Sequence, residues 1–250
     1  IYLLNQGTLL LNPLLKSCSL LLLLCSNLAL AQIPETSSQL IVVTTPDWDA
    51  IQGTAQRYER HGQDFQKVGD AFPIVVGKTG LAWGRGILPI DPEEQPVKRE
   101  GDGKAPAGMF TFGSAFGYES TANTRLPYTV STDARECVDD SQSSHYNSLV
   151  DSSAVSKDWN SSEQMHRKDE LYRQGIVVEH NTPAAANGGS CIFMHIWQSS
   201  STPTTGCTAM DPQNIQQLFT WLDPQKNPLL VQMPVAQYEL YKERWKLPQR

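Results

Sequence analysis

The stretch Cys191-Ile-Phe-Met-His-Ile-Trp197 is an apolar run that carries a single imidazole. A short run of this kind, rich in β-favouring residues, predicts a strand. Because side chains alternate across a strand, Phe193, His195 and Trp197 are expected on one face and the remaining apolar side chains on the other. His195 is therefore predicted to project near the end of a rigid strand.

The residues after this strand bring a thiol within reach of that imidazole. A loop over 198–205 leads to Gly206-Cys207, and Asp211-Pro212 then begins a predicted helix, with Asp as N-cap and Pro in the first turn. A thiol just ahead of a helix N-terminus is expected to have a lowered pKa, because the helix dipole and free N–H groups favour the thiolate. Gly206 allows a tight turn whose N–H groups can face a developing oxyanion. On spacing alone, a nucleophilic Cys207 with His195 as its base and a pair of buried structural residues are equally good interpretations.

Short β-rich runs bounded by turn residues recur along the rest of the chain. Strands are expected over 39–45, 50–60, 64–68, 72–77, 175–180 and 229–233, the second and third as a hairpin. Helical spacing predicts the helix after Asp211 and a second one over 235–246, with Tyr238, Tyr241 and Trp245 on its core side. Closely spaced strands with few helices predict a mainly β, α+β fold with an antiparallel, sandwich-like region in its first part.

Two segments lack the apolar periodicity of these predicted strands and helices. Residues 91–108 are dense in Pro, Gly and charge and are expected to form a loop. Residues 131–170 are polar and weakly periodic, with Trp159 as the main apolar anchor, and are predicted to lie over the surface as a lid or a pinned flap. Asp139-Asp140 in this segment is best interpreted as part of a solvated loop rather than as a metal or acid/base pair.

The first 31 residues have the composition of an export signal. Lys16 is their only charged side chain, an apolar run over 19–25 follows it, and the segment ends in Ala29-Leu-Ala31. This pattern predicts a secretory signal peptide over 1–31, cleaved after Ala31. A membrane anchor is disfavoured because the run falls short of the roughly 20 apolar residues that a span needs. Lipid attachment at Cys25 is disfavoured by the bulky residue before it.

Composition bounds the rest. The chain has 250 residues, and its 20 Lys and Arg against 26 Asp and Glu give a net charge of -6, which excludes a basic nucleic-acid binder. With 40% hydrophobic residues the chain is too apolar to be disordered. No Gly/Ser-rich or Pro-rich linker divides it, so residues 32–250 are predicted to form a single domain.

Two segments together resemble a known enzyme family. Gly189-Ser-Cys-Ile-Phe-Met-His195 followed by Thr204-Thr-Gly-Cys-Thr-Ala-Met210 resembles the L,D-transpeptidase (YkuD-type) signature, in which a strand His precedes a Ser/Thr-x-Gly-Cys element. Lys98-Arg-Glu-Gly-Asp-Gly-Lys-Ala-Pro-Ala-Gly-Met-Phe110 is similar to that family's Gly-Asp-Gly-Lys-Thr-Pro-x-Gly loop. The two motifs occur in the right order, about ninety positions apart, and the resemblance spans Phe72 to Pro234.

The resemblance implies a fold and a set of roles. The fold would be a mixed β-sandwich with a helix after the catalytic Cys. Cys207 would be the acylated nucleophile, His195 its general base and Gly206 part of the oxyanion region, while Thr204 stands where the family has Ser or Thr. The substrates would be peptidoglycan stem peptides and an amine acceptor, with no cofactor, and the enzyme would act in the periplasm or outside the cell, at the cell wall.

Some alternatives remain open at this point. Thr205 and Ala209 stand where many family members have His and Arg or Asn, so hydrolysis by an L,D-carboxypeptidase competes with transfer. A non-catalytic wall-binding module on the same fold is a further alternative. A zinc site built from His180, Cys191, His195 and Cys207 has suitable ligand types but no supporting spacing.

The cysteines left after signal cleavage carry one more prediction. Cys137, Cys191 and Cys207 remain, and an exported protein favours a disulfide over loose thiols. If Cys207 stays free as the nucleophile, Cys137 and Cys191 are expected to be paired, which would pin the polar segment to the strand of His195.

Overall fold

The computed structural model describes residues 1–2, 32–89 and 94–250. The predicted signal peptide over 1–31 therefore lies outside the described residues except for its first two positions. Neither α-helix in the described part of the chain has the length and apolar character needed to cross a membrane.

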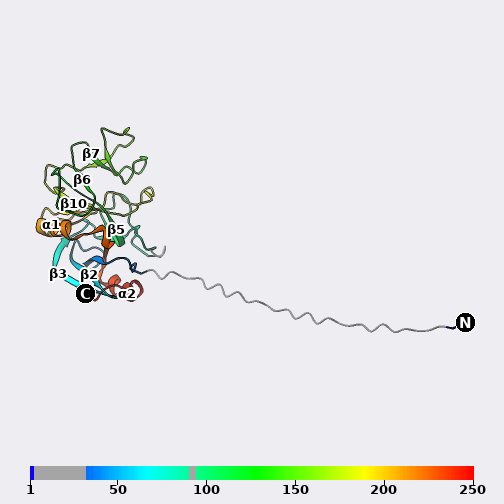
Figure 1. Cartoon of the computed structure of the whole chain (residues 1–250). Helices are drawn as coiled ribbons and strands as arrows, with labels where there is room; N and C mark the ends of the chain where they lie inside the picture. Colours follow the sequence, from blue (N-terminus) through cyan, green and yellow to red (C-terminus); the bar gives the residue numbers. More distant parts are fainter. Residues whose placement is uncertain (3–31, 90–93) are drawn as a thin grey trace.

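Strands far outnumber helices in the described chain, so the predicted mainly β, α+β class is confirmed (Figure 1). The strands of the main sheet are β1 Gln39–Thr45, β2 Gln52–His61, β3 Asp64–Val75, β4 Leu81–Trp83, β5 Ala105–Gly117, β6 Tyr128–Val130, β10 Gln174–Val178, β11 Phe193–Ile196, β12 Thr208–Met210 and β13 Leu229–Pro234. The helices are α1 Pro212–Trp221 and α2 Val235–Trp245, with a 3-10 turn over Pro224–Lys226.

The main sheet closes on itself instead of forming a sandwich of two sheets. Its strands run in the order β10-β11-β12-β3-β2-β1-β13-β5, and β5 pairs back with β10 to complete the ring. Closure depends on β5, whose residues 108–111 pair with β13 while residues 112–117 pair with β10. The predicted sandwich is thus wrong, because alternating burial is the same in a sandwich and in a closed barrel and only these non-local pairings separate them.

Several boundaries differ from the sequence-based predictions. Residues 72–75 are not a separate strand but the end of β3, which continues straight from the predicted hairpin. Residues 105–108 belong to β5 rather than to the predicted loop, and Ala105 and Ala107 are completely buried there. Residues 105–107 pair with β4 and Gly108 begins the pairing with β13, so the Pro and Gly in this stretch belong to a strand and not to a turn.

Both helices form where the sequence predicts them. Asp211 caps α1 by accepting a hydrogen bond from the N–H of Gln213, and Ile215 and Leu218 are buried on its inner face. The core side of α2 holds the three predicted aromatics, Tyr238, Tyr241 and Trp245. Figure 1 shows α2 beside the C-terminus, at the bottom of the molecule in that view.

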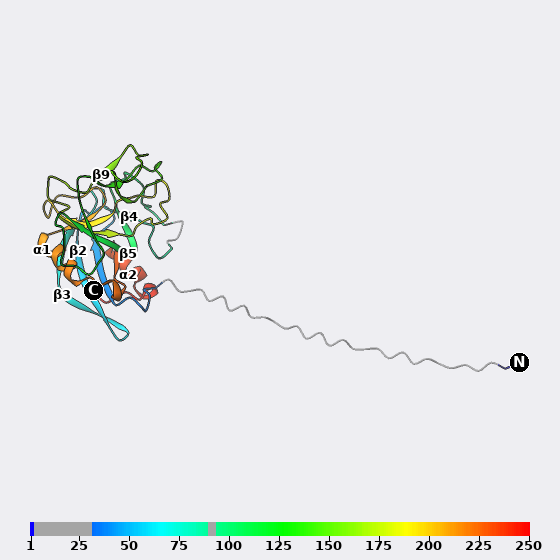
Figure 2. The ribbon, with the colours of Figure 1, turned by 45° about the horizontal axis from the view of Figure 1, so that its top comes forward.

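The polar segment over 131–170 folds into a second, three-stranded sheet at the opposite end (Figure 2). Its strands are β7 Arg135–Val138, β8 Leu149–Asp151 and β9 Ser162–Gln164, in the order β8-β7-β9. We refer to it as the small sheet. Trp159 is buried beside Val138 and Val150, in agreement with its predicted role as the main apolar anchor of this segment. The Cys137–Cys191 disulfide joins β7 to the residues just before β11, which confirms both the predicted pairing and the predicted pin.

Candidate active site

The structure brings His195 and Cys207 to one pocket. His195 lies on β11 and Cys207 immediately precedes β12, and these strands pair in parallel with His195 opposite Ala209. Both side chains line a pocket of about 390 Å³ together with Tyr172 and Thr204. Met194 and the isoleucines beside it pack into the main core, whereas Phe193 packs into a second cluster with Cys207, so the predicted alternation along β11 is confirmed for these residues.

The imidazole of His195 is neutral and held in one orientation. Its Nδ1 donates a hydrogen bond to the carbonyl oxygen of Ile196 at 2.8 Å. Since that oxygen can only accept, Nδ1 carries the hydrogen and Nε2 carries the lone pair. Burial lowers the pKa of His195 to about 4, although the nearby carbonyls of Ile196 and Leu171 act in the opposite direction. At neutral pH His195 is therefore a neutral imidazole whose Nε2 can accept a proton.

Cys207 is a buried thiol, and it is the only free cysteine within the described residues. Its sulfur accepts a hydrogen bond from the N–H of Phe193 at 3.4 Å and faces the carbonyl oxygen of Cys191 at 3.6 Å. Burial, together with the nearby carboxylate of Glu163, raises the pKa of Cys207 to about 12.

The predicted lowering of the Cys207 pKa by a helix N-terminus is therefore wrong for this resting site. The three residues of β12 and the cap Asp211 separate Cys207 from α1, and the helix dipole acts over only about one turn. Thiol and imidazole are both neutral at rest, because burial disfavours both of their charged forms.

Thr204 and Gly206 shape the turn that carries the thiol. Thr204 Oγ1 donates to the carbonyl oxygen of Cys207 at 2.7 Å and accepts from the N–H of Gly206 at 3.1 Å. Two backbone hydrogen bonds, with Val76 and Lys78, fix Thr204 to the segment just after β3. The N–H of Gly206 is thus already bound, and it can contribute to an oxyanion site only if that bond is released.

Cys207 also lines a second pocket of about 160 Å³. Lys98 and Gly101, from the loop similar to the family's Gly-Asp-Gly-Lys loop, line it beside Gly206 and Cys207. A Cβ on Gly206 would lie 3.1 Å from the carbonyl oxygen of Lys104, so the two motifs touch. Lys98 itself is buried and paired with Asp102 at 2.6 Å. The segments that carry the resemblance, distant in sequence, meet at the thiol.

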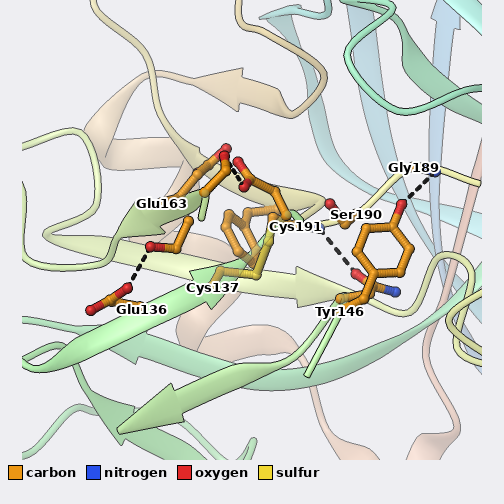
Figure 3. The surroundings of a disulfide bond; sticks show 12 residues. Glu136, Cys137, Tyr146, Glu163, Gly189, Ser190 and Cys191 are labelled. Carbon is orange, nitrogen blue, oxygen red and sulfur yellow. Dashed lines mark hydrogen bonds between the residues drawn. A yellow bond between two sulfur atoms is a disulfide. The ribbon is translucent and has the colours of Figure 1, made fainter. Parts of the chain in front are cut away.

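The small sheet and the disulfide form one wall of this second pocket. Figure 3 shows Glu163 close to the Cys137–Cys191 bond and Tyr146 on the other side of it. The hydroxyl of Tyr146 accepts a hydrogen bond from the N–H of Gly189. Glu163 and Asp139 line the pocket with Cys207, so Asp139 reaches the site although its sequence context predicts only a solvated loop.

The zinc interpretation does not fit this geometry. Cys191 is consumed by the disulfide, and the described residues contain no group of three or more His, Cys, Asp or Glu arranged to hold a metal ion. His180 is buried elsewhere, where Nδ1 accepts from the N–H of Arg85 at 3.2 Å and Nε2 contacts the carbonyl oxygen of Gly188 at 3.0 Å. These two hydrogen bonds give His180 a structural role, since they connect it to the backbone of Arg85 and Gly188.

Two side chains at the site carried no sequence signal. Tyr172 lies in the pocket of His195 and Cys207, and its hydroxyl donates to Glu163 at 2.5 Å. Both come from polar segments without a motif. Glu163 reaches the site through the docking of the small sheet, and Tyr172 through packing on Phe116 and Phe193. Arg167, whose guanidinium lies 4.9 Å from the Tyr172 ring centroid, completes that wall.

Comparison of the chain with protein-family models, curated proteins and solved structures finds no match.

Proposed function

We propose that this protein is an exported cysteine acyltransferase of L,D-transpeptidase type that acts on peptidoglycan stem peptides. One observation carries the proposal: the free cysteine Cys207 lines two pockets, shares one of them with neutral His195, and is joined in the other by the second family-like motif. A structural cysteine needs no second pocket and no oriented base beside it.

The chemistry follows from the protonation states. As the sulfur of Cys207 attacks the carbonyl carbon of the third stem residue, Nε2 of His195 takes the thiol proton. The tetrahedral intermediate then expels the terminal D-amino acid, whose nitrogen receives that proton from His195. The product is a thioester on Cys207 and a neutral imidazole.

The second half of the reaction reverses these roles. An acceptor amine attacks the thioester carbonyl and gives a proton to His195, a new amide forms, and the C–S bond breaks to restore the thiol. Because burial disfavours both thiolate and imidazolium, proton transfer is expected to accompany the attack instead of preceding it.

The charges of the two pockets support one direction of binding. Lys78 lines the larger pocket with His195 and suits the carboxylate of the departing D-amino acid, whereas Arg167 in the same pocket is already paired with Asp169. Glu100, Asp139 and Glu163 line the smaller one, which suits the ammonium group of an acceptor before it loses its proton. A separate acceptor pocket favours transfer over hydrolysis, although an L,D-carboxypeptidase would use the same thioester.

The proposed location is the periplasm or the cell exterior, at the cell wall. The signal-like composition of residues 1–31 supports it, and the Cys137–Cys191 disulfide is compatible with an oxidising compartment.

The test is product analysis by mass spectrometry with defined tetrapeptide and pentapeptide stems, with and without an amine acceptor. We expect loss of the terminal D-amino acid and a cross-linked product that depends on the acceptor. Cys207→Ser should lose nearly all turnover, because a hydroxyl is far less ionised than a thiol. His195→Ala should slow acylation by roughly 100-fold or more. Release of the D-amino acid without any cross-link would instead identify a carboxypeptidase, and no reaction with any stem would favour the wall-binding module.

A further inference from the structure

Tyr172 touches both members of the proposed catalytic pair. Its ring packs edge-on against the imidazole of His195, with centroids 5.0 Å apart, and it is 4% exposed. The side chains of Tyr172 and Cys207 pack in the same buried cluster and line the same pocket. A hydrogen bond donated by the phenol to the sulfur would lower the pKa of the thiol.

The hydroxyl of Tyr172 is committed elsewhere in the resting site. It donates to Glu163 Oε2 at 2.5 Å. A phenol has one proton to donate, so toward Cys207 it can offer only a lone pair while this bond persists. A thiolate at Cys207 would then face an oxygen lone pair and the negative charge of Glu163, and both are unfavourable.

Glu163 is a carboxylate in unfavourable surroundings. Its own burial raises its pKa, and the negative charges of Asp139 and Glu100 act in the same direction, whereas Arg167 and the bond from Tyr172 act against them. The second pocket connects it to solvent, so it can take up a proton from water.

We propose that Tyr172 is a further catalytic residue, whose hydroxyl turns to donate to the Cys207 thiolate when Glu163 is protonated. The protonated carboxyl then donates to Tyr172 Oη, which frees the phenol proton for the sulfur. The thiol proton still goes to His195, and the proton on Glu163 comes from solvent, so no proton is created or lost. Glu163 acts through Tyr172 and is a positioning residue. The inference rests on the proposed role of Cys207 as nucleophile.

The charged and titratable groups around the thiol come from several elements. Glu163 faces it from β9, Tyr172 from the segment before β10, His195 from β11 and Lys98 from the loop before β5. Glu100 and Asp139 line the smaller pocket beside Glu163, and Lys78, Arg167 and Asp169 line the larger pocket beside His195. Lys98 is paired with Asp102, and Arg167 is paired with Asp169. Among the carboxylates, Glu163 is the one whose charge raises the pKa of Cys207, so its removal should have the opposite effect to removal of the Tyr172 hydroxyl.

The test measures the alkylation rate of Cys207 by iodoacetamide between pH 6 and 11 in the full chain with its disulfide intact, quantified at Cys207 by peptide mass mapping. Tyr172→Phe keeps the ring that packs on His195 and should slow alkylation at neutral pH about tenfold. Glu163→Gln removes the charge and supplies an amide that donates to Tyr172, and should speed alkylation about tenfold. In the double variant the gain from Glu163→Gln should shrink, because no hydroxyl remains to be redirected.

Tyr128→Phe is the matched control, since Tyr128 donates to the carbonyl of Glu119 away from the site and should leave the rate unchanged. A role in packing alone would give Tyr172→Phe the rate of the parent protein. That result, or a Glu163→Gln variant that reacts more slowly, would overturn the proposal. Alkylation needs no stem peptide, so this test is independent of the proposed substrate. If the two variants had opposite effects on alkylation but the protein reacted with no stem peptide, only the proposed function would be rejected.

Discussion

The closed barrel and the small sheet are held together by different forces. The barrel encloses a continuous core in which large side chains such as Phe110 and Ile176 are fully buried. The small sheet has an apolar cluster of only three buried side chains, and its loops are tied by hydrogen bonds to carboxylates such as Asp158 and Asp140. The barrel is thus specified by burial of apolar area, and the small sheet by a covalent bond and polar contacts.

The proposed active site lies where these two regions meet. The barrel supplies His195 and Cys207, and the small sheet supplies Glu163. The proposed catalytic pair, His195 and Cys207, is therefore supported by the rigid barrel. Glu163, whose charge opposes a thiolate at Cys207, lies on a part of the molecule with less apolar support.

Truncation of one buried side chain in each region should reveal the largest difference in stability between the barrel and the small sheet. Phe110→Ala in β5 removes a fully buried ring from the barrel core and is expected to lower the free energy of unfolding by about 3–5 kcal/mol. Val150→Ala in β8 should cost only about 1 kcal/mol, because it removes two methyl groups from a small cluster. Urea unfolding curves measure both values. Equal losses would show that the small sheet shares the barrel core.

Breaking the disulfide should affect the small sheet and spare the barrel. The Cys137–Cys191 bond closes a loop of 54 positions, so its loss in a double Ser variant should cost about 4 kcal/mol by the chain-entropy estimate. Amide hydrogen exchange should then rise in β7, β8 and β9 while β1 and β13 stay protected. Faster exchange throughout the barrel would contradict the division between the two regions.

Acid should destabilise the barrel before the small sheet. Burial lowers the pKa of both His195 and His180 from 6.5 to about 4, so the stability they contribute is complete above pH 6.5 and falls as the pH approaches 4. Hydrogen bonds from Ser143 and Ser144 lower the pKa of Asp158 to about 2, so its contribution is complete above its ordinary pKa of 3.8 and is lost only below that.

Each histidine can contribute up to about 3 kcal/mol to this acid sensitivity, since one unit of pKa corresponds to about 1.4 kcal/mol. Urea unfolding at pH 7 and pH 5 measures the loss, and the same experiment on His180→Gln should show a smaller difference between the two pH values. An unchanged difference in that variant would mean that other groups cause the sensitivity.

Removing the Thr204 hydroxyl should have the smallest effect. Thr204→Ala loses the two hydrogen bonds that close the turn before Cys207, at a cost of about 1 kcal/mol in unfolding free energy. Thr204→Ser keeps the hydroxyl and is the matched control, expected to retain the parent rate of stem-peptide turnover. A loss of turnover in Thr204→Ala as large as that in His195→Ala would give the hydroxyl a direct catalytic role.

Local elements of the fold could be predicted where the sequence carries a complete local signal. The β1 run is rich in β-branched residues and bounded by Pro46, and the Asp-Pro cap defines the start of α1. Closure of the barrel could not be predicted, because it depends on β5 pairing with β13 and β10, which lie far away in the sequence. Local periodicity holds no information on such partners.

The site shows the same division. His195, Cys207 and Thr204 sit in one short segment, so their proximity could be predicted from the strand and the turn. The thiol pKa could not, since burial and the charge of Glu163 outweigh any helix effect once β12 separates Cys207 from α1. Glu163 meets the thiol through the docking of the small sheet, and Tyr172 meets it through packing on Phe116 and Phe193, neither of which has a local sequence signal.

The central claim, that Cys207 becomes acylated, is tested most directly by intact-mass analysis after brief incubation with a tetrapeptide stem. The account predicts a mass increase equal to the stem without its terminal D-amino acid, mapped by peptide sequencing to Cys207 and absent from Cys207→Ala. An adduct that persists in Cys207→Ala, or unchanged turnover of the stem by that variant, would contradict it.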